Sequence, residues 1–182
     1  MSLPRDYTSQ ACSLARALEI VGERWTLLIM RDALYGVRRF SDFQAHLQIP
    51  KAVLAERLSA LASEGLLERV PGRAGHDEYA TTAKGRELWP MIQGLMSWGD
   101  RHYAPLGARR LFLHARCETE VSADGYCPSC DVPVGVEDLT AVPGPGLDPE
   151  SERHDFVSDS IAVPHRMLEP IVPGSGPVGA KS

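Results

Sequence analysis

Apolar residues recur at helical spacing through most of the first hundred residues, and glycines divide them into segments. Residues 10–22 and 24–36 each end at a glycine, and the second segment is apolar nearly all round, which predicts a helix buried in the core. Ser41 is placed to cap a short helix that ends at Leu47. The pattern therefore predicts three helices before residue 48, followed by a fourth over residues 50–64.

The helix predicted over residues 50–64 has two distinct faces. The inward positions are Val53, Leu54, Leu58 and Leu61, and the outward positions are Lys51, Ala52, Ala55, Glu56 and Ser59. Gly65 is a typical residue to end this helix. Residues 66–70 and about 78–81 then read as short strands around a Gly/Pro loop, which predicts a β-hairpin.

A long helix to about residue 103, capped by Thr82 and kinked at Pro90, completes the order of a winged helix-turn-helix. In that fold the second helix of the pair lies in the DNA major groove, and the hairpin reaches the minor groove or phosphates. The plainer alternative is a small helical domain with an incidental hairpin, since helix pairs also occur in bundles. We expect a mainly α fold with a small β-wing.

The composition changes after Pro105, so we expect three parts. Residues 1–105 form the winged-helix DNA-binding and dimerisation domain, and residues 106–140, with three of the four cysteines, form a small zinc-ribbon-like β extension. Residues 141–182 are rich in proline and glycine, which predicts a flexible tail. Within that tail, residues 155–172 retain enough apolar side chains to dock locally.

Charge is unevenly distributed along the chain. The net charge is -5, but residues 1–105 carry +1 and residues 106–182 carry -6. A DNA-binding surface must therefore be a local patch in the first half. No stretch approaches about 20 apolar residues, and the first ten residues lack the apolar region of a secretory signal. We expect a cytoplasmic protein with reduced thiols and no membrane contact.

Six short motifs occur in order within residues 10–103, and as a set they resemble the HxlR-type winged-helix regulators of the MarR-like superfamily. They are Gly22-Glu23-Arg24-Trp25-Thr26, Arg39-Phe40-Ser41, Leu54-Ala55-Glu56-Arg57-Leu58, Glu64-Gly65-Leu66, Thr82-Ala83-Lys84-Gly85 and Trp98-Gly99-Asp100. The resemblance implies a homodimeric bacterial transcription regulator that binds double-stranded operator DNA. Occupying promoter DNA blocks transcription, so a repressor is favoured over an activator. The alternative is a winged-helix protein-interaction module that does not bind DNA.

The resemblance also implies that the first and last helices form the dimer contact. They supply more apolar surface than a single winged helix can cover, at Leu14, Leu18, Leu88, Met91, Ile92, Leu95 and Trp98. Of these, Leu14, Leu18, Leu95 and Trp98 are the expected interface residues. A two-fold dimer would place its recognition helices about one DNA turn apart.

Expected DNA contacts follow from position in the fold. The candidates for base edges are Lys51, Ala52, Ala55 and Glu56, and the candidates for phosphate are Arg38, Arg39 and Ser41. The wing offers Arg73 and His76 at its tip and Arg69 along its strand. Arg57 either binds phosphate or braces the fold through an acidic neighbour. Relatives often carry Ser or Thr at the position of Ala55, so one hydroxyl contact is absent here.

A regulator of this kind responds to a signal, and two parts of the sequence are candidates for receiving one. Trp25, Phe40 and Trp98 are candidates to line a small-molecule effector pocket, although such aromatics more often belong to the core. Cys12 stands at the start of the first helix, where some HxlR-type regulators carry a redox-sensing cysteine. The alternative for Cys12 is an inert residue at the dimer contact.

The remaining cysteines form a cluster with metal-ligand spacing. His114-x2-Cys117 and Cys127-x2-Cys130 are separated by nine residues, so two short turns can wrap one structural zinc ion. Reduced thiols without metal, or a Cys127–Cys130 disulfide, are the alternatives. Four protein ligands leave no open coordination position on the zinc ion for catalysis. The spacing of the other residues indicates no set of catalytic nucleophile and base. We therefore expect no enzymatic activity.

Overall fold

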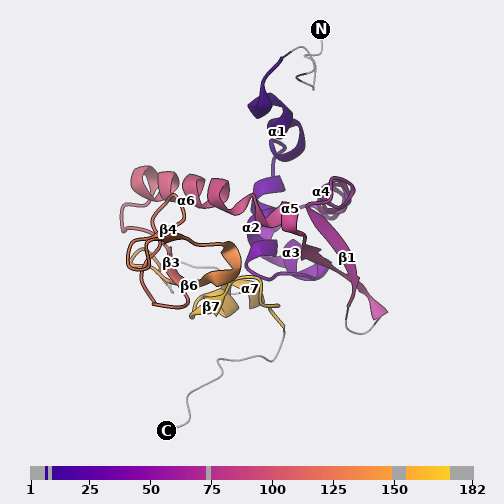
Figure 1. Ribbon diagram of the computed structural model, residues 1–182. Coiled ribbons are helices and arrows are strands. Elements are labelled where there is room, and N and C mark those ends of the chain that lie inside the picture. The colour runs from indigo at the N-terminus through magenta and orange to yellow at the C-terminus, as the bar shows by residue number, and fades with distance from the viewer. Residues whose placement is uncertain (1–6, 8–9, 73–74, 149–154, 173–182) are drawn as a thin grey trace.

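Four helices open the fold in the computed structural model, which describes residues 7, 10–72, 75–148 and 155–172. They are α1 (Ser13–Val21), α2 (Thr26–Leu34), α3 (Phe40–Leu47) and α4 (Lys51–Ser63). Helices α2, α3 and α4 pack together because each turns an apolar stripe inward. Residues such as Met30, Phe43 and Leu58 are fully buried between them. Helix α1 instead projects away from the body of the molecule (Figure 1).

The wing follows α4 directly, as the sequence predicts. Strands β1 (Leu67–Pro71) and β2 (Asp77–Thr81) pair antiparallel, with Leu67 opposite Thr81. Gly65 ends α4 in the left-handed conformation at φ 68°, which glycine adopts without steric cost. The hairpin extends away from the helices (Figure 1). The mainly α fold with a β-wing is confirmed.

Two details of the helix boundaries differ from expectation. Helix α3 begins two residues earlier than predicted, because Arg39 and not Ser41 is its N-cap residue. Ser41 therefore lies inside the first turn and does not cap the helix. The single long helix is divided into α5 (Ala83–Arg86) and α6 (Trp89–Tyr103). Thr82 caps α5 as predicted, accepting a hydrogen bond from the Gly85 N–H. Pro90 has no N–H to donate to the preceding turn, so it lies at the start of α6 and not at a kink.

The extension after Pro105 is built on two small sheets. Strand β3 (Arg110–His114) pairs with β6 (Leu139–Pro143), which also pairs with β7 (His165–Arg166). Strands β4 (Tyr126–Cys127) and β5 (Val132–Pro133) form a second hairpin, and the 3-10 helix η2 (Val136–Asp138) precedes β6. A small β extension is therefore present, as predicted.

Residues 155–172 dock on the rest of the molecule, as their apolar side chains allowed, so the expected flexible tail does not include them. They form helix α7 (Phe156–Ile161) and β7, and they bury Val157, Ile161, Met167 and Ile171. The many prolines and glycines favoured a flexible tail, but α7 packs against α3 and β6, and β7 pairs with β6. The expected boundary at residue 140 also divides β6.

A hydrogen-bonded clamp joins this C-terminal segment to the end of α2. The Leu168 N–H donates to the Leu34 carbonyl at 2.9 Å and the Ile171 N–H to the Gly36 carbonyl at 3.0 Å. Gly36 adopts φ 97°, and a Cβ there would lie 1.8 Å from the Glu169 carbonyl oxygen. Only glycine fits this approach.

The core is continuous between the winged helix and the extension. Trp89 on α6 contacts Phe112 on β3 edge to face, with ring centroids 4.7 Å apart, and Tyr35 stacks on the same ring. One buried cluster therefore includes residues from Val21, at the end of α1, to Ile171. No helix in the described ranges is long and apolar enough to cross a membrane.

Candidate DNA-binding face and metal site

Helix α4 leaves one face open to solvent. Leu54, Leu58 and Leu61 are buried, while the four predicted base-reading positions are all exposed: Lys51, Ala52, Ala55 and Glu56. The first two lie in the first turn, because Pro50 is the N-cap residue. The face therefore combines a cation, two small side chains and a carboxylate, which can meet donor and acceptor groups on base edges.

The predicted phosphate contacts lie at the start of α3. The Tyr79 N–H donates to the Arg38 carbonyl at 2.9 Å, so Arg38 lies beside strand β2 of the wing. The Arg39 guanidinium forms a two-bond ion pair with Asp42, at 2.8 and 3.2 Å. Ser41 is exposed and donates to the Asp42 carboxylate. The Arg39–Asp42 ion pair was not predicted from the sequence, although i,i+3 spacing of opposite charges on a helix is a signal for one.

Arg57 contacts acidic neighbours from both α4 and the loop before α2. Its guanidinium lies 2.7 Å from the Glu56 carboxylate and 3.8 Å from that of Glu23, and its side chain is only 18% exposed. This is the bracing arrangement that the sequence left open as one alternative. It ties α4 to the segment that connects α1 and α2.

The wing carries one described cation on its strand. Arg69 is exposed, and its guanidinium lies over the ring of Tyr79 at 5.9 Å from the centroid. His76 is exposed near the tip, where its carbonyl accepts a hydrogen bond from the Gly72 N–H. Arg73, the predicted contact at the tip, lies outside the described residues.

Helices α1 and α6 carry an exposed apolar surface. Leu14 is 64% exposed, Leu95 51% and Trp98 48%, and Leu18 and Met91 are also exposed. Two of the side chains that the sequence placed on this surface lie elsewhere, because Ile92 is buried in the core and Leu88 packs against it. The other five large apolar side chains still lie exposed on these two helices, whereas exposed apolar residues on an ordinary protein surface are scattered singly.

Cys12 is the N-cap residue of α1 and is exposed. Its side chain makes no capping hydrogen bond. It therefore lies at the outer end of the helix that carries Leu14 and Leu18.

The three aromatic candidates for an effector pocket have different surroundings. Trp25 packs against the core beneath the Arg24 guanidinium, and Trp98 is exposed on α6 beside His102 and Tyr103. Phe40 lines a cavity that lies between α3, β2 and the C-terminal segment, and neither Trp25 nor Trp98 is among the residues that line this cavity. The structure does not bring the three together.

Two tight turns bring the Cys/His cluster together, as the spacing predicts. His114 ends β3 and Cys127 ends β4, and each is followed by a turn that presents Cys117 or Cys130. The first turn is closed by the Glu118 N–H donating to the His114 carbonyl, and the second by the Asp131 N–H donating to the Cys127 carbonyl. Glu118 and Asp131 both adopt positive φ there. The two turns are therefore built alike.

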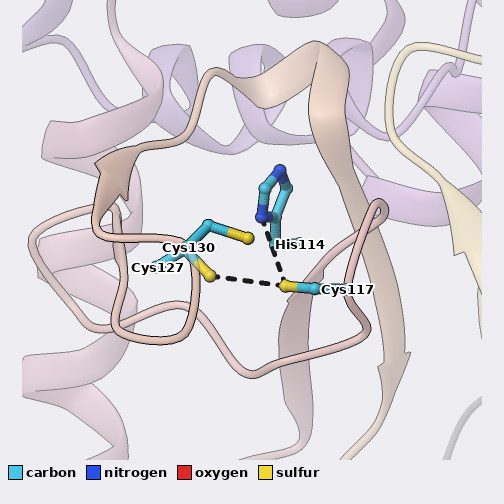
Figure 2. Close-up of side chains that lie close together, drawn as sticks. All are labelled: His114, Cys117, Cys127 and Cys130. Atoms are coloured by element: carbon cyan, nitrogen blue, oxygen red, sulfur yellow. Dashed lines mark hydrogen bonds between the residues drawn. The ribbon is translucent and has the colours of Figure 1, made fainter.

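The four side chains converge on one point (Figure 2). All four ligand atoms lie within 4.8 Å of one another. The Cys117 Sγ is 3.4 Å from the His114 Nδ1 and 3.5 Å from the Cys127 Sγ. In a tetrahedral zinc site these separations would be about 3.5 and 3.8 Å, given the usual zinc–ligand bond lengths. All four cysteines are free thiols, so the Cys127–Cys130 disulfide is not formed.

Hydrogen bonding distributes charge unevenly in the cluster. The Thr119 hydroxyl and backbone, together with the neighbouring thiols, lower the pKa of Cys117 to about 6. The hydrogen bond to Cys117 and burial raise the pKa of Cys130 to about 11. Thr119 is a residue that sequence spacing did not single out. Three thiols and one imidazole form a donor set that suits Zn²⁺.

Comparison with known proteins assigns the family. The model of the HxlR-like helix-turn-helix matches residues 20–106. The uncharacterised HTH-type transcriptional regulator Mb3122 of Mycobacterium bovis is 41% identical over 138 residues, which cover 74% of this chain and 87% of the relative. That alignment is longer than the family match, so it includes part of the extension. YvaP of Bacillus subtilis, another uncharacterised HTH-type regulator, is 34% identical over 93 residues, which cover 50% of this chain and 86% of the relative.

A solved structure agrees with this assignment. PA1607, described as a candidate transcription factor, is 33% identical with a TM-score of 0.58 and covers 72% of this chain and 94% of its own. These relatives are regulators, which confirms the expectation that the chain is not an enzyme. The chain belongs to the HxlR-like helix-turn-helix family of DNA-binding transcription regulators.

Proposed function

We propose that two copies of this chain bind double-stranded operator DNA as a repressor, with α4 in the major groove. The observation that carries this proposal is the exposed face of α4, where Lys51, Ala52, Ala55 and Glu56 are free of packing contacts with the core. The wing extends on the same side of the molecule as α4 (Figure 1). It would reach the neighbouring minor groove or phosphates.

Phosphate contacts come from the start of α3 and from the wing in this proposal. Arg38, Arg39 and Ser41 precede or open α3, whose N-terminal N–H groups also favour an anion. Arg69 and Arg73 would contact the backbone from the wing. Arg57 contributes indirectly, because its ion pairs with Glu23 and Glu56 fix the position of α4.

Dimerisation follows from the apolar surface of α1 and α6. Leu14, Leu18, Leu95 and Trp98 are all exposed, and α1 projects away from its own protomer, where it can pack against a partner (Figure 1). Burying this surface in a two-fold interface would remove several large apolar side chains from water, each contributing about 1.5–3 kcal/mol when fully buried.

A structural zinc ion is proposed for the extension. His114, Cys117, Cys127 and Cys130 would hold it through one imidazole nitrogen and three thiolates. The ion would cross-link the turn after β3 to the turn after β4. With all four positions taken by protein ligands, its role would be to stabilise the extension.

The regulatory signal is proposed to be a small molecule or an oxidant. Cys12 is exposed on the helix that carries part of the dimer surface, so its oxidation would alter the packing of α1. An inert Cys12 at the dimer contact is the competing assignment. Substitution of Cys12 by serine distinguishes the two, because an oxidant that still abolishes DNA binding of this variant acts elsewhere.

A DNA-binding titration tests the proposed function. The purified full chain is titrated against labelled DNA from upstream of its own gene and against a scrambled duplex, at about 50 and 200 mM salt. We expect selective binding whose affinity falls by at least about tenfold between these salt concentrations, because phosphate contacts release counterions. Equal binding to both duplexes, or binding that does not depend on salt, would refute the proposal.

A further inference from the structure

A cavity of about 510 Å³ opens at the edge of the DNA-binding face. It lies where the start of α3, the start of β2 and the C-terminal segment meet. Its lining residues are Arg38, Arg39, Phe40, Ser41, His76, Asp77, Glu78, Pro170, Ile171 and Val172. This volume is in the range of small-molecule sites, about 300–1,000 Å³. We propose that this groove binds an effector that is a monoanion with an apolar body, such as an aromatic or aliphatic carboxylate.

The apolar wall of the groove is preorganised. Phe40 forms one part of it, and Pro170, Ile171 and Val172 form the other. The clamp from the C-terminal segment to Leu34 and Gly36 fixes this second part, and Ile171 is only 6% exposed. An apolar ligand would therefore meet a surface that is already in place and would not have to order a loose tail.

The charged lining selects the head group. Among the described residues, the Arg38 side chain makes no hydrogen bond or ion pair, so its guanidinium is available to hold a carboxylate through two hydrogen bonds. Arg39 is already paired with Asp42. Asp77 and Glu78 also line the groove and would repel a second negative charge. A ligand with one carboxylate on an apolar body fits the apolar wall, pairs with Arg38 and brings no second negative charge near Asp77 and Glu78.

Binding of such a ligand would exclude DNA. Arg38, Arg39 and Ser41 are the groups proposed to hold phosphate, and all three line the groove. A ligand on Arg38 would occupy the same guanidinium and place an anion where the DNA backbone must pass. The groove is thus proposed as the site of an inducer, and this regulatory role rests on the proposed function.

Direct ligand binding tests the site. Benzoate, 2-naphthoate and decanoate are titrated into the full chain by calorimetry, with 2-naphthamide as a neutral analogue and 2,6-naphthalenedicarboxylate as a dianion. We expect at least one monoanion to bind, and 2-naphthamide and the dianion to bind about tenfold more weakly than 2-naphthoate, because the amide loses a charge-assisted hydrogen bond and the dianion meets Asp77 and Glu78. Failure of all three monoanions to bind, or equal affinity for acid and amide, would overturn the proposal.

Variants locate the site on the molecule. Arg38→Gln should weaken 2-naphthoate binding about tenfold and leave the affinity for 2-naphthamide unchanged. Ile171→Ala should weaken both several-fold, about the loss expected for part of a buried isoleucine. Ile161→Ala is the matched control, because Ile161 is equally buried in α7 and does not line the groove. If the two isoleucine variants weaken 2-naphthoate binding equally, or if Arg38→Gln does not weaken it, the ligand binds outside this groove.

DNA competition separates this site from the proposed function. The apparent affinity for the upstream DNA should fall as 2-naphthoate is added to the wild-type chain. If the chain binds no DNA but binds 2-naphthoate through Arg38, the ligand site stands and the operator-binding proposal falls. If DNA binding is intact and 2-naphthoate binds without displacing it, the inducer site is overturned alone.

Discussion

Arg38 and Arg39 are adjacent in the chain but differ in their surroundings. Arg39 is held by Asp42 in a two-bond ion pair, whereas the Arg38 side chain has no such partner among the described residues. A phosphate group must compete with Asp42 for Arg39 but not for Arg38. The sequence Arg38-Arg39 alone does not reveal this difference, because it depends on how the start of α3 is wound.

This difference gives a prediction for the salt dependence of DNA binding. Arg38→Gln should reduce the slope of log affinity against log salt by about one, the value expected when one phosphate contact is lost. Arg101→Gln is the control, since Arg101 is exposed on α6 and hydrogen-bonds to Ser97, away from α4. An unchanged slope for Arg38→Gln, or an equal change for the control, would remove Arg38 from the DNA contact.

At the level of elements, the short helix α7 depends on the residue that caps it. The Asp155 side chain accepts hydrogen bonds from the Val157 and Ser158 N–H groups. It also lies 3.1 Å from the His46 Nδ1 on α3. Burial raises the pKa of Asp155, but hydrogen bonds from Ser158 and the neighbouring His46 outweigh this and hold the pKa below its usual value. The carboxylate therefore stabilises the docked segment in its charged form.

Replacing this cap should destabilise the folded chain in a pH-dependent way. Asp155→Ala should lower the free energy of unfolding by about 0.5–2 kcal/mol at neutral pH, because alanine cannot accept the capping hydrogen bonds. A lowered folded pKa means that the stabilisation is present above the unfolded pKa of about 3.9 and is lost as pH falls through the folded value. The free energy of unfolding is measured in denaturant at pH 7 and near pH 3, with Asp159→Ala as the control on the same helix. An equal deficit of the Asp155 variant at both pH values would contradict a charged cap.

The elements that the sequence predicted correctly are those defined by local patterns. Helix α4, the wing and the two metal-ligand turns each depend on residues close together in the sequence. The hydrophobic period was sufficient to predict α4, Gly65 to predict where it ends before the wing, and the x2 spacing to predict the two turns. The break at Pro90 was expected as a kink, but the missing N–H ends one helix and starts another. Ser41 was a reasonable cap by residue type, yet the Asp42 and Phe43 N–H groups bond to the Arg39 carbonyl, so the helix begins earlier.

The apolar side chains of residues 155–172 indicated that the segment could dock, but the place where it docks could not be derived from local pattern. Their partners include residues 34–36, which lie more than 120 positions earlier in the chain. Val157, Ile161, Met167 and Ile171 are buried, and the helix and sheet that cover them are distant in sequence, so no local rule places them together. The groove at the DNA-binding face was missed for the same reason, because part of its wall comes from this segment.

At the scale of the whole molecule, one sheet joins the candidate metal site to the loop that leads into the proposed DNA-binding face. His114 pairs with Leu139 on β6, and β6 pairs with β7. The His165 ring on β7 lies 2.7 Å from the Tyr35 carbonyl, just before Gly36 and Arg38. Loosening the metal site would therefore weaken the support of the loop that leads into α3.

Metal removal should consequently affect both stability and DNA binding. We expect about one zinc per chain by elemental analysis, because the four ligands suit a single tetrahedral ion, and Cys127→Ser should abolish it. The free energy of unfolding of this variant should be lower by about 2 kcal/mol or more, which for a chain of this size lowers the unfolding midpoint by about 4–8 °C. The variant should also bind DNA more weakly. Cys12→Ser is the control and should retain metal and midpoint. Folded wild-type chain without metal, or a Cys127→Ser variant of unchanged midpoint, would contradict the structural zinc site.

Two chains, in the proposed complex, place their two α4 helices on one side of the DNA. Hydroxyl-radical footprinting of the tightest-binding upstream fragment, with the mass of the complex measured in parallel, tests this arrangement most directly. We expect two protected half-sites related by a dyad, about 10 base pairs apart centre to centre, and two chains per fragment. A single protected half-site with one chain bound, or a protected region without dyad symmetry, would contradict it.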